Sequence, residues 1–373
     1  MLQDHELGAW LRLCLTPGVG NATARQLLAA FGLPEAIFDQ SHTALASVVS
    51  PKLASALKAE PEGWRELCDT TRRWLDTPLD NGAGRHILTL GDPDYPAELL
   101  QTEDPPLLLY LLGQRSALRV PHRVAMVGSR NPTPQGAENA HQFAQALAQA
   151  GVCVVSGLAL GVDGAAHQGA LDGGGTTLAV VGTGLDRVYP KKHLALAHRI
   201  AEHGALLSEY PLGTPPLSAN FPKRNRIIAG LSHGTLVVEA ALQSGSLITA
   251  RLASEQGREV FAIPGSIHAP QSRGCHALIR QGAKLVESAQ DVLEDLRLSL
   301  PPTPPRTATP GDAPAQHGHP LLAVLGYDPV GLDALQARTG LPTPELQAQL
   351  LELELDGHIA SLPGGLFQRV GLG

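Results

Sequence analysis

The stretch from Phe221 to Thr249 contains the residue types that best fit a binding site. Lys223, Arg224 and Arg226 place three cations within four residues, with no acidic residue beside them. An apolar strand, a Gly-Ser turn and a helix are expected to follow. Cations, backbone N–H groups and the positive end of a helix dipole all bind phosphate. The stretch therefore predicts anion binding; the alternative is a solvated basic loop beside an ordinary crossover.

Other small and cationic residues follow apolar segments in the same way. Ser129 and Arg130 end the segment that begins at Val124, and Gly157 ends the next one. Because ligands bind at the carboxyl ends of parallel strands, we expect Arg130 to reach a phosphate there. A phosphate cradle is also expected at the start of a later helix, formed by Gly245, Ser246 and Thr249.

Two further residues of the basic stretch have alternative interpretations. Phe221 offers a stacking face to a nucleotide base, or else fills the core beneath the loop. Asn225 either hydrogen-bonds a base edge or fixes the loop, and the structural role is favoured. Asp163 and Glu239 are expected to brace the cations of the pocket, since unpaired carboxylates would repel phosphate. The lone histidines His167 and His233 are expected to be structural.

The composition indicates a large globular protein with two to four domains. Its 373 residues include 43% hydrophobic residues, 40 glycines and 4% aromatic residues, as in α/β proteins. No run of eighteen apolar residues occurs, and the first ten residues carry acids where a signal peptide carries bases. We therefore expect a soluble, cytoplasmic protein. The four cysteines are scattered, which indicates neither disulfides nor a metal site.

The charge is unevenly distributed along the chain. The net charge is −7, but residues 115–287 hold 16 Lys and Arg against 10 Asp and Glu, a local charge of +6. The remaining residues hold 12 against 25, or −13. A basic middle between acidic flanks fits an anionic partner that is held at one site.

Alternation of apolar segments with amphipathic helices predicts a Rossmann-like, doubly wound parallel α/β sheet in the middle of the chain. The predicted strands begin at Val124, Val152, Thr177, Ala205, Thr235 and Glu259. Residues from Ile87 onward are expected to form a strand and loop region that leads into this sheet. We expect four parts in all: a helical domain of the SAM or helix-hairpin-helix type (1–80), the Rossmann-like domain (85–298), a Pro-rich linker (299–319) and a winged-helix domain (320–373).

The two flanking domains each raise a question about DNA contact. The N-terminal turn Pro17-Gly-Val-Gly20 is typical of a helix-hairpin-helix, which offers backbone N–H groups to phosphate. A plain αα-hairpin is the favoured alternative. The third helix of the winged-helix domain, from Pro344 to Glu354, carries acids and no base. A DNA-reading helix is basic, so a protein contact is expected here instead.

The ordered motifs of residues 87–296 resemble the DNA processing protein A (DprA/Smf) family. The matching motifs include Tyr95-Pro96, Val127-Gly-Ser-Arg130, Ser156-Gly-Leu-Ala-Leu-Gly-Val-Asp163, Gly182-Thr-Gly-Leu-Asp186 with Tyr189-Pro190, Phe221-Pro-Lys-Arg-Asn-Arg226 and Ser244-Gly-Ser-Leu-Ile-Thr249. The resemblance implies a homodimer that binds single-stranded DNA in a basic pocket and loads RecA recombinase on it during natural transformation and homologous recombination. It also implies no catalytic residues and no cofactor, whereas the cysteine pattern and the lack of long apolar runs indicate no metal site and no membrane insertion. Other DNA-uptake or single-strand-binding proteins are further expected partners.

An enzyme is the main alternative. Gly234-Thr235-Leu-Val-Val-Glu239 resembles part of a signature of nucleotide phosphoribohydrolases, but Leu231-Ser-His233 replaces its Pro-Gly-Gly and the glutamate is displaced by one residue. These departures weaken the alternative. No G-x-G-x-x-G follows the first strand and no Walker A motif occurs, which argues against an oxidoreductase and an ATPase.

Overall fold

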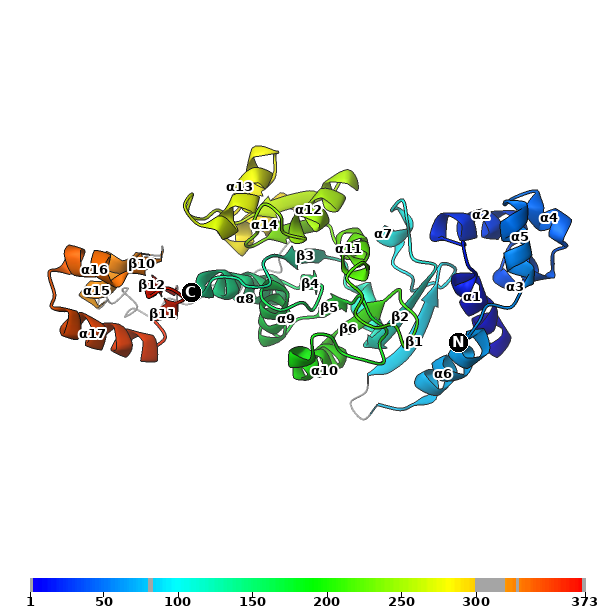
Figure 1. Cartoon of the computed structure of the whole chain (residues 1–373), viewed down its shortest axis with the longest axis horizontal. Coiled ribbons are helices and arrows are strands. Elements are labelled where there is room, and N and C mark those ends of the chain that lie inside the picture. Colours follow the sequence, from blue (N-terminus) through cyan, green and yellow to red (C-terminus); the bar gives the residue numbers. More distant parts are fainter. Residues whose placement is uncertain (1–2, 80–82, 299–318, 327–328, 371–373) are drawn as a thin grey trace.

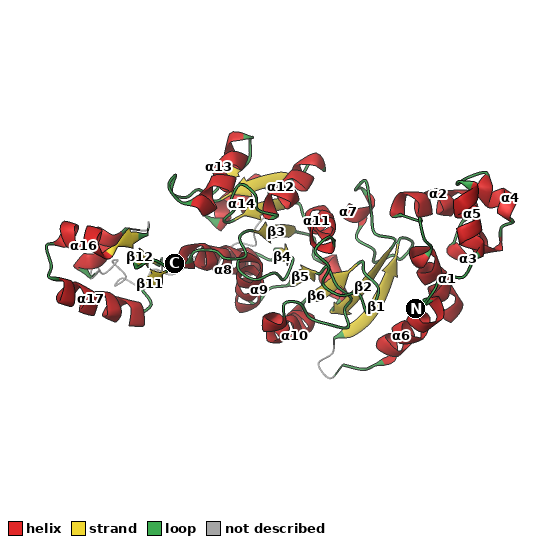
Figure 2. Cartoon of the chain, in the orientation of Figure 1, coloured by secondary structure: helices red, strands yellow, loops and turns green. Residues whose placement is uncertain are grey.

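Apolar segments from the middle of the chain form one nine-stranded sheet in the computed structural model, which describes residues 3–79, 83–298, 319–326 and 329–370. The order is β1-β2-β6-β5-β4-β3-β7-β8-β9. Figure 2 shows the part of it from β1 to β3. The strands are β1 (Gly84–Thr89), β2 (Leu108–Gly113), β3 (Arg123–Val127), β4 (Cys153–Ser156), β5 (Thr177–Val180), β6 (Ala205–Ser208), β7 (Gly234–Val237), β8 (Glu259–Ala262) and β9 (Lys284–Leu285).

The parallel part of the sheet confirms the predicted Rossmann-like fold. Every neighbouring pair from β6 to β9 is parallel. All residues of β3, β4, β5 and β7 are buried, as expected for strands covered on both faces. The chain runs outward from β3 through β4 and β5, then returns to add β7 on the other side of β3. The strand order therefore reverses between β3 and β7, where such sheets bind ligands.

The predicted strand and loop region is a β-hairpin that extends the sheet. β1 pairs antiparallel with β2, and β2 pairs antiparallel with β6. The buried Tyr110 of β2 meets the ring of Trp74 edge-on, with centroids 5.9 Å apart. Because β2 buries apolar side chains on both faces, it adds to the parallel sheet and also supports the N-terminal helices.

Helices cover both faces of the sheet, and adjacent residues of one strand illustrate this. Val154 packs in one apolar cluster with Ala140 and Val162, whereas Val155 packs in another with Ile227 and Ala250. The helical segments of this region are α7 (Ala97–Leu100), η1 (Arg115–Arg119), α8 (Pro134–Gln149), α9 (Val162–Asp172), η2 (Lys191–His193), α10 (Leu194–His203), α11 (Asn220–Leu231), α12 (Ser246–Glu255), η3 (Pro270–Ser272), α13 (Arg273–Arg280) and α14 (Ala289–Asp295).

The cationic run lies on a helix, and the expectation of a loop was wrong. Helix α11 starts at Asn220 and includes Phe221, Lys223, Arg224 and Arg226. Arg224, Ile227 and Ile228 are buried, which is the three-to-four-residue spacing of a helix face. Pro222 is tolerated because the N–H groups of a first helical turn need no intrahelical partner.

The N-terminal part consists of six helices that share an apolar cluster with the edge of the sheet. They are α1 (Asp4–Leu15), α2 (Asn21–Phe31), α3 (Pro34–Asp39), α4 (His42–Ala46), α5 (Pro51–Lys58) and α6 (Trp64–Asp76). Leu11 and Leu27 belong to the same cluster as Ile200 of α10 and Leu206 of β6. The N-terminal helices are therefore packed onto the core rather than tethered beside it (Figure 1).

The C-terminal part is a small winged helix with its own apolar core. Its elements are α15 (Pro320–Leu325), β10 (Val330–Gly331), α16 (Leu332–Thr339), α17 (Thr343–Leu355), β11 (Ile359–Leu362) and β12 (Leu366–Arg369). The sheet order is β10-β12-β11, and the buried core includes Leu335, Leu346 and Leu350. Residues 299–318 of the predicted linker lie outside the described residues. Across the part of the chain that is described, no helix has the length and apolarity needed to cross a bilayer.

Candidate nucleic-acid interface

The N-terminal end of α11 lies at the carboxyl ends of β4 and β5. A Cβ atom on Gly157, just after β4, would lie 1.5 Å from the Nη1 atom of Arg224. A Cβ atom on Gly182, after β5, would lie 3.2 Å from the ring of Phe221. The fold therefore brings together residues of two turns and one helix that are up to 67 positions apart in sequence.

Arg224 carries a buried guanidinium that has no anionic partner in the described structure. The residue is 5% exposed, and its Nε has no hydrogen-bond partner. No ion pair within 4 Å joins it to a described carboxylate. Burial lowers the pKa of Arg224, and the field of Asp163 opposes that effect. A buried cation without a hydrogen-bonded anion is costly, so this position favours the arrival of an anion.

Asp163 holds the loop after β4 rather than pairing directly with a cation. Its Oδ2 accepts hydrogen bonds from the backbone N–H groups of Gly157 (3.1 Å) and Ala159 (3.2 Å). Between them Leu158 adopts the left-handed conformation, with φ of 60°. Burial raises the pKa of Asp163, while Arg224 and these two N–H groups oppose the rise. The carboxylate braces the cation only through its field and through the loop beneath it.

Glu239 has a different role from the one that the sequence predicted. Its carboxylate accepts hydrogen bonds from the N–H (2.9 Å) and Oγ1 (2.6 Å) of Thr133, the N-cap of α8. Burial raises the pKa of Glu239, and the Thr133 contacts oppose this. The expectation that Glu239 braces a cation was wrong, because the carboxylate is occupied by a helix start.

An aromatic pair stands beside Arg224. The rings of Phe221 and Tyr189 have centroids 5.7 Å apart and planes inclined at 33°. The guanidinium carbon of Arg130 lies 5.7 Å from the Phe221 centroid, within the range of a cation–π contact. Phe221 is half-buried against Gly182, and Tyr189 is 47% exposed. The packing against Gly182 agrees with the space-filling interpretation of Phe221, and the stacking role stays a prediction.

Four exposed cations either contact this pair or lie within three residues of it in sequence, and none has an ion pair to a residue that the structure describes. They are Arg130, Lys191, Lys192 and Lys223. Sequence reasoning did not select Tyr189, Lys191 or Lys192 as site residues. The signal available for them was the Tyr-Pro-Lys-Lys run that follows the Gly-x-Gly turn after β5. The site thus has more free cations than the α11 run alone provides.

Arg226 is occupied by acidic residues. Its Nε lies 3.0 Å from Asp104 Oδ2, its Nη2 pairs with Glu209, and its side chain is only 13% exposed. Asn21, in the N-terminal hairpin, donates to Glu209 at 2.9 Å. The expected phosphate contact of Arg226 is therefore not supported by the geometry. The turn Pro17-Gly-Val-Gly20 is followed at once by Asn21, whose side chain contacts Glu209 of the core. This contact favours a plain αα-hairpin over a DNA-binding helix-hairpin-helix.

The phosphate-binding turn predicted at the start of α12 lies next to α11, but its Ser246 and Thr249 side chains are buried. Asn225 Nδ2 donates to the carbonyl of Gly245 at 3.4 Å, which supports the structural role for Asn225. The Ser246 hydroxyl lies 2.7 Å from that of Ser244. Ser246 and Thr249 are 7% and 1% exposed. Ser129 lies beside Arg130 as expected, and its Oγ accepts from the N–H of Asn131 at 3.1 Å.

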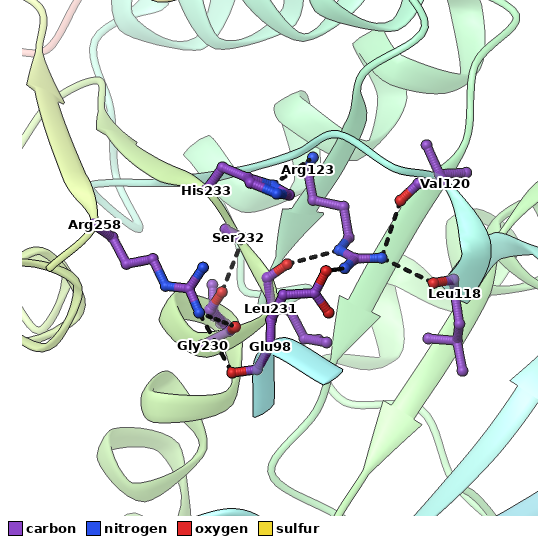
Figure 3. Close-up of polar contacts among 10 residues, drawn as sticks. Glu98, Leu118, Val120, Arg123, Gly230, Leu231, Ser232, His233 and Arg258 are labelled. Atoms are coloured by element: carbon purple, nitrogen blue, oxygen red, sulfur yellow. Dashed lines mark hydrogen bonds and ion pairs between the residues drawn. The ribbon is translucent and has the colours of Figure 1, made fainter. Parts of the chain in front are cut away.

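Two arginines, Arg123 and Arg258, fix the C-terminal end of α11 (Figure 3). Arg123 donates to the carbonyls of Leu231 (2.7 Å) and Leu118 (2.8 Å) and pairs with Glu98. Arg258 donates to the carbonyl of Gly230 at 3.1 Å. Cations at a helix C-terminus stabilise the helix dipole. This clamp holds α11 by the end that is opposite Phe221 and Arg224.

The two histidines are structural, as expected. His233 accepts a hydrogen bond from the N–H of Arg123 at 3.3 Å through its Nδ1. His167 is fully buried, with Nδ1 2.7 Å from Thr177 Oγ1. Within the described ranges, no three His, Cys, Asp or Glu side chains are grouped so that they could hold a metal ion.

Together, the fold and the site define a Rossmann-like protein with a cationic, aromatic strand-end site and an attached winged helix. Residues 86–297 match the family model described as DNA recombination-mediator protein A, and residues 302–365 match the DprA winged helix domain. The chain belongs to this DprA/Smf family, which confirms the resemblance seen in the motifs.

Relatives at high identity cover most of the chain. Protein Smf of Escherichia coli K12 is 45% identical over 307 residues, covering 81% of this chain and 80% of that protein. DNA processing protein DprA of Streptococcus pneumoniae is 52% identical over 204 residues, covering 55% and 72%.

Two solved structures are also similar. The DprA structure from Streptococcus pneumoniae has a TM-score of 0.66 at 38% identity, covering 79% of this chain and 98% of that one. DNA processing protein A from Helicobacter pylori, described as having a unique single-stranded DNA binding mode, has a TM-score of 0.52 at 33% identity and covers 57% and 96%.

Proposed function

We propose that this protein binds single-stranded DNA at the strand-end site formed by Arg130, Gly157, Phe221, Lys223 and Arg224. The observation that carries the proposal is the buried Arg224 guanidinium without an anionic partner, next to a partly exposed aromatic pair. Single-strand binding by the Helicobacter pylori relative supports the same chemistry.

Each part of the site matches one part of a single strand. A phosphate beside Gly157 would accept hydrogen bonds from the Arg224 guanidinium. The exposed side chains of Lys223 and Arg130 would bind neighbouring phosphates. Phe221 and Tyr189 would stack on unpaired bases, a contact worth roughly 1–3 kcal/mol per base. Duplex has the higher charge density, so the stacking term is what selects single strands.

The family assignment supports a wider role than binding alone. We infer that the bound strand is protected and handed to RecA recombinase during natural transformation and homologous recombination, in the cytoplasm and without catalysis. Other DNA-uptake or single-strand-binding proteins are proposed as further partners. The proposed domains are those expected from the sequence: 1–80, 85–298 and 320–373, with residues 299–319 as the linker.

A homodimer is also proposed, and exposed apolar side chains indicate a surface for it. Leu242 (57% exposed) and Leu285 (50% exposed) line a groove beside α13 together with Ile279. Burial of such side chains against a second copy would remove apolar area from water. Sedimentation of Leu242→Glu against the unaltered chain tests this surface, and equal masses would place the dimer contact elsewhere.

The test of DNA binding is a titration of labelled single strand and of duplex of equal length, at two salt concentrations. We expect single strand to be favoured by about tenfold or more, equivalent to about 1.4 kcal/mol. Each phosphate contact should add roughly −0.7 to the slope of log K against log salt. A slope near zero, or equal affinity for both forms, would contradict the proposal.

A further inference from the structure

Helix α17 exposes an apolar stripe on the face that points away from the winged-helix core. Pro344, Ala348, Leu351 and Leu355 follow one another at spacings of four, three and four residues, so they share one side of the helix. Leu351 is 57% exposed and Leu355 is 80% exposed. The opposite side, with Leu346 and Leu350, is buried in the core. The stripe is therefore unused by the fold of its own domain.

The stripe is bordered by negative charge only. Glu345, Glu352 and Glu354 are exposed on α17, Asp356 follows it, and no Lys or Arg occurs between Thr343 and Asp356. In a winged helix this third helix is the element that could enter a DNA groove, and here it would repel the phosphates. Exposed leucines among carboxylates fit a surface that is both cationic and aromatic.

The strand-end site at the start of α11, taken together with the neighbouring Tyr189 and Lys192 and called the α11 site below, is a cationic and aromatic surface on the same chain. Its exposed cations include Arg130, Lys192 and Lys223, and its accessible rings are Phe221 and Tyr189. Carboxylates and leucines offer it the same two contacts as phosphates and bases. A segment that occupies the α11 site must offer negative charge to its cations and apolar side chains to its rings. Helix α17 offers both, so we select it on charge complementarity as the occupant from this chain.

We propose that α17 docks on the α11 site and competes there with single-stranded DNA. The proposal rests on the proposed function, since it assigns a second occupant to the same site. In the described arrangement β12 of the winged helix instead contacts α8 of the core, away from α11 (Figure 1). Twenty residues separate Leu298 from His319. Fully extended, they span at most about 70 Å, which provides the reach for a second arrangement.

Neutralising the acids of α17 in the full chain tests the competition. In Glu345→Gln/Glu352→Gln/Glu354→Gln, the docked state should be less populated and single-strand affinity should rise by about threefold or more, because the competent fraction sets the apparent affinity. The rise should shrink at high salt, where docking of either variant is screened. Leu351→Gln/Leu355→Gln should raise affinity too, without any change of charge.

A matched control separates docking from overall charge. Glu62→Gln/Glu66→Gln/Asp76→Asn removes three exposed acids without an ion pair among the described residues, from the N-terminal part of the chain. Its affinity should stay within about twofold of the unaltered chain. Equal affinity in the α17 triple variant and this control would overturn the proposal. So would weaker binding in the leucine variant, which would make α17 part of the DNA surface. Failure of the unaltered chain to bind single strands would instead reject the proposed function.

Discussion

The guanidinium of Arg224 lies directly against Gly157, so that a Cβ on residue 157 would fall 1.5 Å from Nη1. The Arg224 side chain can therefore take this position only if residue 157 is a glycine. The glycine ends β4 and the arginine lies in α11, so neither element alone determines it. The consequences for binding and stability can be measured separately.

Gly157→Ala should displace the Arg224 side chain and weaken single-strand binding. The added methyl group cannot fit without a shift, and overpacking of this kind costs about 1–3 kcal/mol of unfolding free energy. Urea unfolding and single-strand titration check the two effects. Gly91→Ala is the control, because nothing lies within 4 Å of its Cβ position. Unchanged affinity in Gly157→Ala would show that Arg224 does not contact the strand.

Lys223→Ala and Arg226→Ala should behave differently although both remove one charge from α11. Lys223 is exposed and has no ion pair among the described residues, so its loss should reduce the salt slope by roughly 0.7. Arg226 pairs with Asp104 and Glu209, so its loss should mainly lower the unfolding free energy. Salt titrations and urea unfolding of both variants distinguish the roles. A salt slope that falls equally in both would mean that Arg226 leaves its acids to bind DNA.

Phe221→Ala should narrow the preference for single strand over duplex. Its ring and that of Tyr189 are the accessible stacking faces of the site, and each stacked base contributes roughly 1–3 kcal/mol. Duplex affinity should change less, since paired bases are not available to stack. Parallel titrations with both DNA forms measure the gap. If the gap is the same as in the unaltered chain, Phe221 only fills space against Gly182.

Arg123→Met should be strongly destabilising. The side chain is 3% exposed. It pairs with Glu98, which is 25% exposed, and donates to the carbonyls of Leu231 and Leu118, which would be left buried without this donor. Each buried acceptor that loses its partner costs about 1–3 kcal/mol of unfolding free energy. Arg251→Met is the control, since its pair with Glu255 is exposed and contributes about 0–1 kcal/mol. Similar urea midpoints for the two variants would contradict the clamp on α11.

His167 should make the fold sensitive to mild acid. Burial lowers the pKa of His167 to about 3, with smaller effects of His193 and Arg224 in the same direction. The unfolded chain binds this proton below about pH 6.5 and the folded chain does not until about pH 3, so stability falls as pH drops through that window. The loss is at most about 1.4 kcal/mol per pH unit. His167→Asn should show a flatter stability profile between pH 7 and pH 5 than either the unaltered chain or the exposed-site control His198→Asn. Parallel profiles in all three proteins would mean that His167 is protonated in the fold.

The amino-acid sequence predicts the Rossmann-like sheet, because apolar segments of four to six residues that alternate with amphipathic helices have few other ways to be buried. It also determined the family, through motifs at strand ends, and the acidic character of α17. Arg130, Phe221, Lys223 and Arg224 were selected for their residue types, and the fold brings Arg130, Phe221 and Arg224 to one place.

Which of these cations are free of an acidic partner depends on how the folded domain packs. Lys223 and Arg226 are both cationic and lie three residues apart, yet Asp104 and Glu209 pair only with Arg226. Glu239 is expected from the sequence to brace a cation, yet its carboxylate accepts hydrogen bonds from Thr133 instead. Tyr189 gains its meaning from Phe221, 32 residues later. The physical reason is common to all three cases: local sequence fixes the periodicity of an element, but ion pairs and ring contacts join residues whose distance is set by the packing of the whole domain.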